Sequence, residues 1–453
     1  MKIIIVGCGK VGYSLAEQLN EEGHEITIID SSEYKVNMVG NALDVMSIHG
    51  NATSHHVQME AGIEEADLLI AVTNKDEVNL LCCLIARKAG HCQTIARVRN
   101  PEYYSEISFI KEELGLSLAI NPELTAAEDI ERLIQIPSVM DVDSFAKGKV
   151  DLVRFRVPEG SSWADKRLID INKKFKGNML VCIIERAGTH EILIPDGNAQ
   201  IHEGDYISVV VPLNSLKALF AAVGVESRQI KDVIIAGGGT IAYYLANKLL
   251  QSRMQVKIIE KNRDRCEELS ELLPKAIVIC GDATNTELLK EEGIDNVDAF
   301  VSLTGIDEEN VMISCYAGMA SDAKVITKIN KVGYENILVN LNLGSITSPR
   351  KLTTENIIKY VRGMQNSVGS AVEAVYRLLD GKAEALEFTV KKDSKVLNKP
   401  LAELKIKNNL LLCNIVRKGK AILPTGQVSI CAGDTVIVVT THKGLDEIDD
   451  ILA

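Results

Sequence analysis

The opening segment of the chain constrains its fold more than any other feature. Residues 2–30 read KIIIVGCGKVGYSLAEQLNEEGHEITIID: an apolar run, three glycines, a helical pattern and a second apolar run that ends in Asp30. The first run is short enough to be a strand buried on both faces of a parallel sheet. The glycines have the G-x-G-x-x-G spacing, at Gly7, Gly9 and Gly12. The segment therefore predicts a strand–turn–helix–strand unit of the dinucleotide-binding type.

Each part of this unit has a physical reason to meet a nucleotide. Gly7 permits the tight turn, Gly9 lets a pyrophosphate approach the backbone, and Gly12 allows the helix and strand to pack closely. The N-terminus of the helix offers free N–H groups and the positive end of its dipole. Asp30 stands where a carboxylate accepts hydrogen bonds from an adenosine ribose. A turn without a ligand is the alternative, but the acid at the end of the second strand favours a nucleotide.

The chain contains this opening a second time. Residues 233–236 form an apolar run that leads into Gly237-Gly238-Gly239, and a later apolar run ends in Glu260. Two more signals recur in the same order: GNAT at 50–53 returns as GDAT at 281–284, and TNKDEVN at 73–79 returns as TGIDEEN at 304–310. A shared order of signals indicates an internal duplication.

Each copy combines two kinds of pattern. Apolar runs first alternate with helical segments, which is typical of an open parallel sheet with helices on both faces. Shorter β-type runs then follow, separated by turns such as Asp196-Gly197 and Gly204-Asp205. We therefore predict an α/β protein with two Rossmann-like, doubly wound parallel-sheet domains, each followed by a small α+β domain. The predicted domains span residues 1–122, 141–225, 230–348 and 368–453.

Composition excludes several classes of protein. The formal net charge of −12 argues against nucleic acid as a partner, because phosphates call for a basic face. The apolar runs are shorter than the ~20 residues that a membrane helix needs, and the first strand begins at once, so we expect neither a membrane span nor a signal peptide. Ten cysteines without a C-x-x-C pair predict reduced, buried thiols in a cytosolic protein.

We predict no metal site. His55 and His56 lie in a polar segment with no cysteine or carboxylate at ligand spacing, so we expect them to be exposed. The acidic helix starts at 76–79 and 307–310 are typical of helix capping, with a regulatory cation site as the alternative. The single tryptophan, Trp163, is expected to anchor the first small domain.

In open parallel sheets a ligand lies outside the carboxyl ends of the strands. In the first copy, the residues predicted there are Gly7, Cys8, Gly9, Lys10, Val11, Gly12, Asp30, Asn51, Ala52, Thr53, Thr73, Asn74 and Arg97. In the second copy they are Gly237, Gly238, Gly239, Thr240, Ile241, Glu260, Asp282, Ala283, Thr304, Gly305 and Lys328. Arg97 and Lys328 occupy matching positions, where a cation either meets phosphate or pairs with nearby surface carboxylates.

The acids at the strand ends decide which cofactor we expect. Asp30 and Glu260 favour a free ribose and would repel a 2′-phosphate, so NAD(H) is predicted rather than NADP. The residues leave ATP and ADP open, since both share the adenosine and its phosphates. We find no convincing catalytic set, and the small domains look too small to enclose a substrate.

The motifs as a set resemble a known family. They are the loops GCGKVG and GGGTIA with their acids Asp30 and Glu260, the GNATS and GDATN segments, VTNKDEVN and LTGIDEEN, and the two small β-rich modules. Over nearly its whole length the chain is similar to the regulatory subunits of Trk-type potassium uptake systems, which carry tandem regulator of K⁺ conductance (RCK) units. The second copy departs from the first at two of these positions: Ala242 stands where the first copy has its third glycine, and Gly305 stands where the first copy has Asn74.

The resemblance implies a cytosolic gating-ring subunit rather than an enzyme. Such a subunit would lie at the inner face of the cell membrane, bound to a membrane-embedded Trk potassium channel subunit, as a homo-oligomer that forms a tetramer-like ring of tandem RCK units. Two helices expected to leave their own domain, Glu123 to Ile134 and Leu352 to Met364, would pack on a neighbour. A nucleotide would regulate the ring by binding one of two conformations of the ring more tightly than the other. The alternative is an NAD-dependent oxidoreductase with an atypical small second domain.

Overall fold

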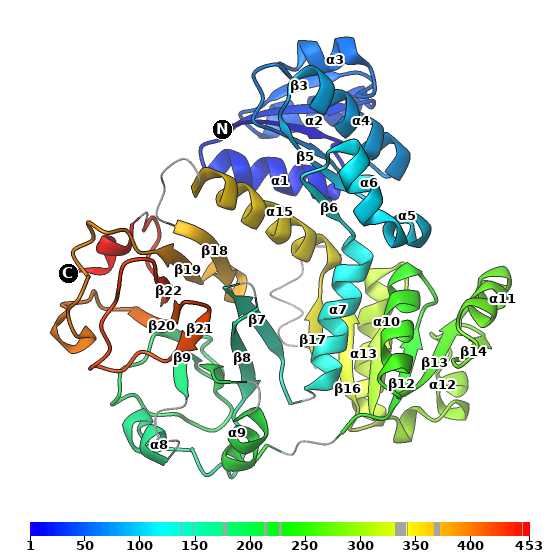
Figure 1. Ribbon diagram of the computed structural model, residues 1–453. Helices are drawn as coiled ribbons and strands as arrows, with labels where there is room; N and C mark the ends of the chain where they lie inside the picture. The colour runs from blue at the N-terminus through cyan, green and yellow to red at the C-terminus, as the bar shows by residue number, and fades with distance from the viewer. Residues whose placement is uncertain are drawn as a thin grey trace.

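The structure is a computed structural model that describes residues 1–136, 138–146, 148–174, 179–212, 215–225, 229–330, 341, 343–366, 372–445 and 447–453. It consists of two halves with the same plan, and each half contains a six-stranded parallel sheet followed by a five-stranded antiparallel sheet (Figure 1). This architecture confirms the predicted fold class. Parts of the third and fourth predicted domains, residues 331–340 and 368–371, lie outside the described residues.

The first parallel sheet is organised around the opening segment. Its strand order is β3-β2-β1-β4-β5-β6, so β1 lies between β2 and β4 near the centre. Ile3, Ile4 and Ile5 are at most 2% exposed because helices cover both faces, which is why this strand is a continuous apolar run. The strands are β1 (Lys2–Val6), β2 (Glu25–Asp30), β3 (Met46–His49), β4 (Leu68–Ala71), β5 (Gln93–Arg97) and β6 (Leu118–Ile120). The helices are α1 (Lys10–Glu21), α2 (Glu33–Ala42), α3 (His55–Glu60), α4 (Asp76–Ala89), α5 (Pro101–Ser105) and α6 (Ile107–Leu114).

The second parallel sheet repeats the first strand for strand. Its order is β14-β13-β12-β15-β16-β17, and every pairing is parallel. The strands are β12 (Asp232–Ala236), β13 (Gln255–Glu260), β14 (Ile277–Cys280), β15 (Ala299–Ser302), β16 (Lys324–Lys328) and β17 (Ser345–Thr347). The helices are α10 (Thr240–Gln251), α11 (Arg263–Leu272), α12 (Thr286–Glu291), η2 (Ile294–Asn296) and α13 (Asp307–Ala320).

Each antiparallel sheet belongs to a small domain. The first, ordered β10-β9-β11-β8-β7, has strands β7 (Asp141–Phe145), β8 (Val150–Arg156), β9 (Leu180–Glu185), β10 (Ile192–Leu193) and β11 (Tyr206–Val210), with helices α8 (Leu168–Lys174) and α9 (Leu216–Val223). The second, ordered β18-β19-β22-β20-β21, has strands β18 (Val372–Leu378), β19 (Ala383–Thr389), β20 (Leu410–Arg417), β21 (Lys420–Ile422) and β22 (Thr435–Thr440), with short helices η3 (Leu379–Gly381), η4 (Leu401–Glu403) and η5 (Ile448–Ile451).

The two small domains share one hydrophobic core. Phe145 and Cys182 of the first domain lie in the same buried cluster as Leu378 and Cys413 of the second. Trp163 is 3% exposed within the separate core of the first small domain, as predicted for an anchor. No helix among the described residues is both long enough and apolar enough to cross a membrane.

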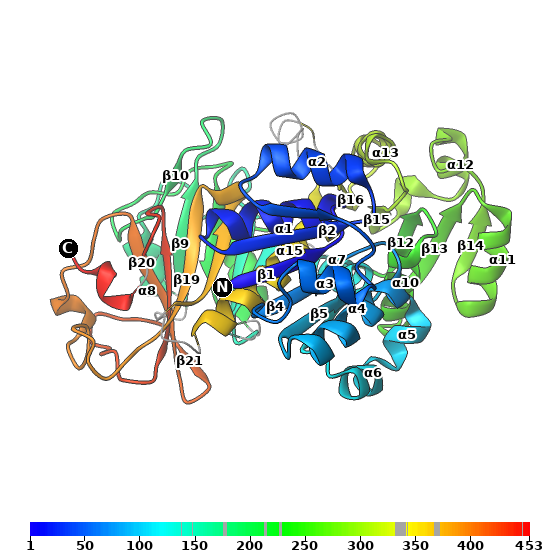
Figure 2. The same cartoon turned by 90° about the horizontal axis from the view of Figure 1, so that it is seen from above.

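Two helices, α7 (Pro122–Gln135) and α15 (Pro349–Asn366), cross between the halves. Ile130 of α7 is buried in the core of the second parallel-sheet domain, against α10. Ile357 of α15 is buried in the core of the first, against α1. Both views show α15 running beside α1 and α7 beside α10 (Figures 1 and 2). The neighbour on which these helices pack is thus the other half of the same chain, so their apolar faces do not argue for a homo-oligomer.

Candidate nucleotide-binding site

The glycine turn of the first half has the geometry that a phosphate needs. Gly7 has a φ of +106°, which a residue with a side chain rarely adopts. A Cβ on Gly9 would find no atom within 4 Å, so a ligand has open access to the backbone at the start of α1. A Cβ on Gly12 would lie 1.8 Å from the carbonyl oxygen of Gly7, so the close packing of turn and helix requires glycine there.

The carboxylate of Asp30 is fixed beside this turn. One of its oxygens accepts a hydrogen bond from the backbone N–H of Cys8 at 2.6 Å, and the other accepts one from Ser32 at 2.8 Å. Each carboxylate oxygen has a second lone pair, so the group still accepts hydrogen bonds from ribose hydroxyls. The same geometry recurs in the second half, where Glu260 accepts from Gly238 at 2.6 Å and from Asn262 at 2.8 Å.

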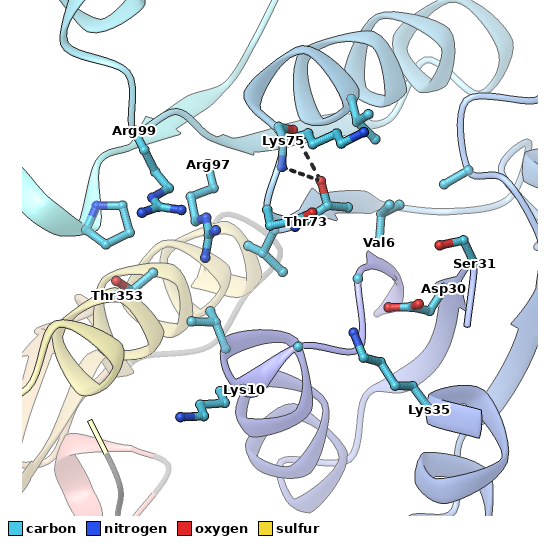
Figure 3. A pocket seen from close by; sticks show the side chains of 18 of the residues that line it. Val6, Lys10, Asp30, Ser31, Lys35, Thr73, Lys75, Arg97, Arg99 and Thr353 are labelled. Atoms are coloured by element: carbon cyan, nitrogen blue, oxygen red, sulfur yellow. Dashed lines mark hydrogen bonds between the residues drawn. The ribbon is translucent and has the colours of Figure 1, made fainter. Parts of the chain in front are cut away.

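The turn and the acid open onto a cavity of about 790 Å³. A cavity of this size is within the range of small-molecule and cofactor sites. Figure 3 shows basic side chains from several elements around it, with Lys35 near Asp30 and Arg97 and Arg99 directed towards the helix that carries Thr353. The cationic side chains that line it are Lys10, Lys35, Lys75, Arg97, Arg99 and Arg350. The cavity therefore suits an anionic ligand with several negative charges.

Arg97 faces the cavity from the end of β5. Its Nε is buried and has no hydrogen-bond partner among the described residues. Burial lowers the pKa of this arginine, and the neighbouring Arg99 lowers it further. Both effects disfavour the charged form, and a bound anion would offset both.

One side chain holds two of the strand ends around the cavity together. The amide of Asn79, on α4, accepts from the backbone N–H of Thr73 at 2.8 Å and donates to the carbonyl of Arg97 at 2.9 Å. Asn310 makes the same contacts with Thr304 and Lys328, at 2.8 and 3.0 Å. Sequence reasoning placed both asparagines only in an acidic helix start.

Asp76 and Glu77 lie in the first turn of α4, where carboxylates complement the helix dipole, but no described side chain caps the helix by a hydrogen bond. Asp76 instead accepts from the backbone N–H groups of Arg99 and Asn100 in the loop after β5, both at 2.7 Å. Within the described part of the chain, no group of histidine, cysteine and carboxylate side chains is arranged to hold a metal ion. His55 and His56 are both exposed.

Most of the residues predicted for the first copy line the cavity. Those that do are Gly7, Gly9, Lys10, Val11, Asp30, Asn51, Ala52, Thr73, Asn74 and Arg97. Three stand behind the lining: the N–H of Cys8 is taken by Asp30, Gly12 packs against the turn, and Thr53 donates to the side chain of Asn51. The lining residues that sequence reasoning did not predict include Ser31, Lys35, Lys75, Arg99, Glu123, Asn330, Pro349, Arg350 and Thr353.

The second half has a smaller depression of about 440 Å³ at the corresponding place. Of the predicted residues, Gly238, Gly239 and Glu260 line it, together with Asn262, Asp264, Arg265 and Glu268. The other predicted residues do not line it: Gly237, Thr240, Ile241, Asp282, Ala283, Thr304, Gly305 and Lys328. Lys35 and Arg265, which line the two clefts, were not predicted from the sequence. The duplication could have indicated them, because they are cations at matching positions of the two copies.

Comparison with known proteins gives the same division of the chain. The TrkA-N domain family matches residues 3–122 and 233–349, and the TrkA-C domain family matches residues 152–224 and 385–453. The "Trk system potassium uptake protein TrkA homolog" of Archaeoglobus fulgidus is 32% identical over 451 residues, which is 100% of each chain. The "Trk system potassium uptake protein TrkA" of Halomonas elongata is 32% identical over 98% of this chain and 96% of its own.

Solved structures share the fold at low sequence identity. The "GsuK Channel" superposes with a TM-score of 0.65 at 15% identity, over 98% of this chain and 77% of that chain. The "GsuK channel bound to NAD" gives a TM-score of 0.63 at 16% identity, with the same coverage. Since both the sequence and the domain order match throughout, the chain belongs to the TrkA family of Trk system potassium uptake proteins, with the TrkA-N and TrkA-C pair present twice.

Proposed function

We propose that this chain is the nucleotide-binding regulatory subunit of a Trk-type potassium uptake system and controls K⁺ flux through a membrane-embedded channel subunit. One observation carries the proposal: the first cavity is lined by residues of both halves of the chain. The first half supplies Gly9 and Asp30, and the second supplies Arg350 and Thr353 from α15. A ligand that contacts both halves has different affinities for two arrangements of them, which is what a regulatory ligand requires.

The fit of the residues to an adenine nucleotide supports the proposal. The open backbone at Gly9 suits a pyrophosphate, and Asp30 retains acceptor capacity for a ribose. The proposed ligands are NAD(H) and the adenosine phosphates ATP and ADP. Relatives named for the Trk system, and a solved GsuK channel with NAD bound, are consistent with this assignment.

We further propose that the subunit acts at the inner face of the cell membrane as a ring of tandem units. Because α7 and α15 are covered within one chain, contacts between chains must use other surfaces. Leu81 on α4 is 45% exposed, and Met312, at the matching position on α13, is 70% exposed. Two apolar side chains repeated on equivalent helices are suited to contacts between copies.

Reconstitution tests this function directly. The membrane-embedded Trk subunit of the same organism would be placed in liposomes, and ⁸⁶Rb⁺ uptake would be measured with and without this chain and with each nucleotide. We expect the flux to change only when chain and nucleotide are both present, and we expect the nucleotide to be recovered chemically unchanged. Flux that is indifferent to the chain, or net oxidation or reduction of the nicotinamide, would favour the oxidoreductase alternative instead.

A further inference from the structure

The two nucleotide clefts differ in charge although duplication gave them the same turn and acid. Around the first cavity the cations Lys10, Lys35, Lys75, Arg97 and Arg99 come from the first half. The matching residues of the second half are Thr240, Arg265, Ile306, Lys328 and Asn330. Three of the five cations are therefore replaced by uncharged residues. The first cleft has the charge needed for a polyphosphate, and the second does not.

The two crossing helices both reach the first cavity, and the residues that they place there, Glu123 and Arg350, have opposite charges. Both helices begin at a proline, Pro122 in α7 and Pro349 in α15, and the next residue is Glu123 in one and Arg350 in the other. Glu123 acts electrostatically on Lys328 at the strand end of the second cleft. Arg350 lines the first cavity, where it adds a positive charge from the other half of the chain.

Glu123 is neutralised by a partner, and Arg350 is not. The carboxylate of Glu123 forms an ion pair with Nε of Arg99 at 2.7 Å. The residue that matches Arg99 in the second half is Asn330, whose backbone N–H donates to Asp307 at 3.0 Å. Within the described ranges, no carboxylate forms an ion pair with Arg350. Its charge is thus available to a ligand.

Two arginines that line this cavity each have a buried donor atom without an acceptor in the described part of the chain. The Nε atoms of Arg97 and Arg350 are both buried and have no hydrogen-bond partner among the described residues. A buried guanidinium N–H without an acceptor is costly, and phosphate oxygens are acceptors that match the geometry of arginine. One arginine belongs to each half, so a phosphate between them would connect the halves.

The strand-end cation of the second cleft already has acceptors. Nζ of Lys328 donates to the carbonyl oxygen of Thr304 at 2.6 Å and lies 3.4 Å from that of Leu303. Three carboxylates line this cleft, those of Glu260, Asp264 and Glu268, against the single cation Arg265. A triphosphate there would meet net repulsion.

We propose that a nucleoside triphosphate binds the first cleft with its terminal phosphates between Arg97 and Arg350, and that the second cleft does not take a triphosphate. The first cleft is then a polyphosphate site that joins the two halves, and Arg350 sets its preference for ATP over NAD. This inference rests on the proposed nucleotide site. The second cleft keeps Glu260 and its glycine turn, so it binds ligands that carry fewer phosphate charges.

Calorimetric titration of the full-length chain with ATP, ADP and NAD tests the inference. We expect one tight equivalent of ATP per chain. Arg350→Ala should weaken ATP about ten- to hundred-fold, because it removes a charge-assisted contact to phosphate, and should change NAD binding less than about three-fold. Arg350→Glu, which replaces this positive charge with a negative one, should weaken ATP binding further. Thermal unfolding would confirm that each variant is folded.

Lys351→Ala is the matched control. It removes the same unit of charge from the adjacent, exposed position of α15, which does not line the cavity, so its ATP affinity should equal that of the wild type. If Arg350→Ala and Lys351→Ala bind ATP alike, or if the wild type takes two equal ATP equivalents, the inference is wrong while the nucleotide site stands. If the wild type binds none of the three nucleotides, the proposed function is also wrong.

Discussion

At the scale of single residues, the proposed recognition of a ribose depends on Asp30. Its two carboxylate oxygens are held by the N–H groups of Cys8 and Ser32, so the side chain is oriented before any ligand arrives. A carboxylate in this position accepts hydrogen bonds from ribose hydroxyls and repels a 2′-phosphate. An amide would keep one acceptor but turn an NH₂ group towards one of the two backbone donors.

We therefore expect the wild type to bind NAD more tightly than NADP. Asp30→Asn should weaken NAD by about ten-fold, through the loss of one charge-assisted hydrogen bond, while it relaxes the rejection of NADP. Titration of both dinucleotides against both proteins measures the ratio, and Glu260→Gln is the matching change in the second half. A wild type with equal affinities, or a ratio unchanged in Asp30→Asn, would show that this carboxylate does not read the ribose.

The duplication offers an internal comparison at the third glycine position. A Cβ on Gly12 would lie 1.8 Å from the carbonyl oxygen of Gly7, whereas Ala242 occupies the matching position, fully buried. We expect Gly12→Ala to destabilise the protein by about 2–4 kcal/mol, since the turn must shift. Ala242→Gly should cost only about 1 kcal/mol, the ordinary helix penalty of glycine. Denaturant unfolding measures the free energy of unfolding of both variants. Equal losses would mean that the first glycine turn can shift to accommodate a Cβ, as the second turn does.

Residue patterns predicted the turn and acid but only part of the lining. Gly9, Asp30 and Arg97 follow strands of one segment, where spacing alone indicates that they meet. Arg350 and Thr353 reach the same cavity from a helix more than two hundred residues away in the chain. No local period or motif encodes such a meeting, because it depends on how the two halves pack.

At the scale of elements, the crossing helices unite the halves. Their amphipathic patterns predicted helices that leave their own domain, and the structure places Ile130 and Ile357 in the cores of the opposite domains. An apolar face on a helix indicates only that something packs against it. It does not indicate whether this partner is another chain or a distant part of the same chain.

The sequence did not predict the edge strands β6, β7, β17 and β18, because short or mixed runs give a weak period-two signal.

One contact between the halves should depend on pH. Asp129 on α7 accepts a hydrogen bond from Thr347, at the end of β17, at 3.0 Å. Burial, together with the nearby Asp141, raises the pKa of Asp129 to about 6, although Thr347 and Arg132 act in the opposite direction. The other charged or titratable groups in this region are Asp143, Lys351 and Glu355.

The folded state therefore holds a proton on Asp129 that the unfolded state releases near its ordinary pKa of about 4. The cost of this buried charge is complete above about pH 6 and disappears as the pH falls towards 4. Asp129→Asn keeps an acceptor for Thr347 without the charge, so it should stabilise the protein by about 1–2 kcal/mol at pH 8, and by progressively less from pH 6 to pH 4. Unfolding midpoints across that range measure this, and a gain independent of pH would contradict the assignment.

At the scale of the whole molecule, the chain is a duplicated unit whose copies have diverged where they meet. The order of motifs predicted both parallel sheets and the repeated small domains, because strand–turn–helix signals and their recurrence are local. The same reasoning predicted a nucleotide site in each half. One difference between the clefts comes from α15, which brings Arg350 to the first cleft, and this depends on how the two halves pack.

Hydrogen–deuterium exchange of the full chain, with and without ATP, tests most directly whether the nucleotide joins the two halves. The ends of a helix open more readily than its interior, so we expect amides at the start of α15 to exchange measurably in the free protein. We predict that ATP slows exchange both at the glycine turn, residues 7–12, and at residues 350–353 of α15. Protection at the glycine turn alone, with α15 unchanged, would contradict the account.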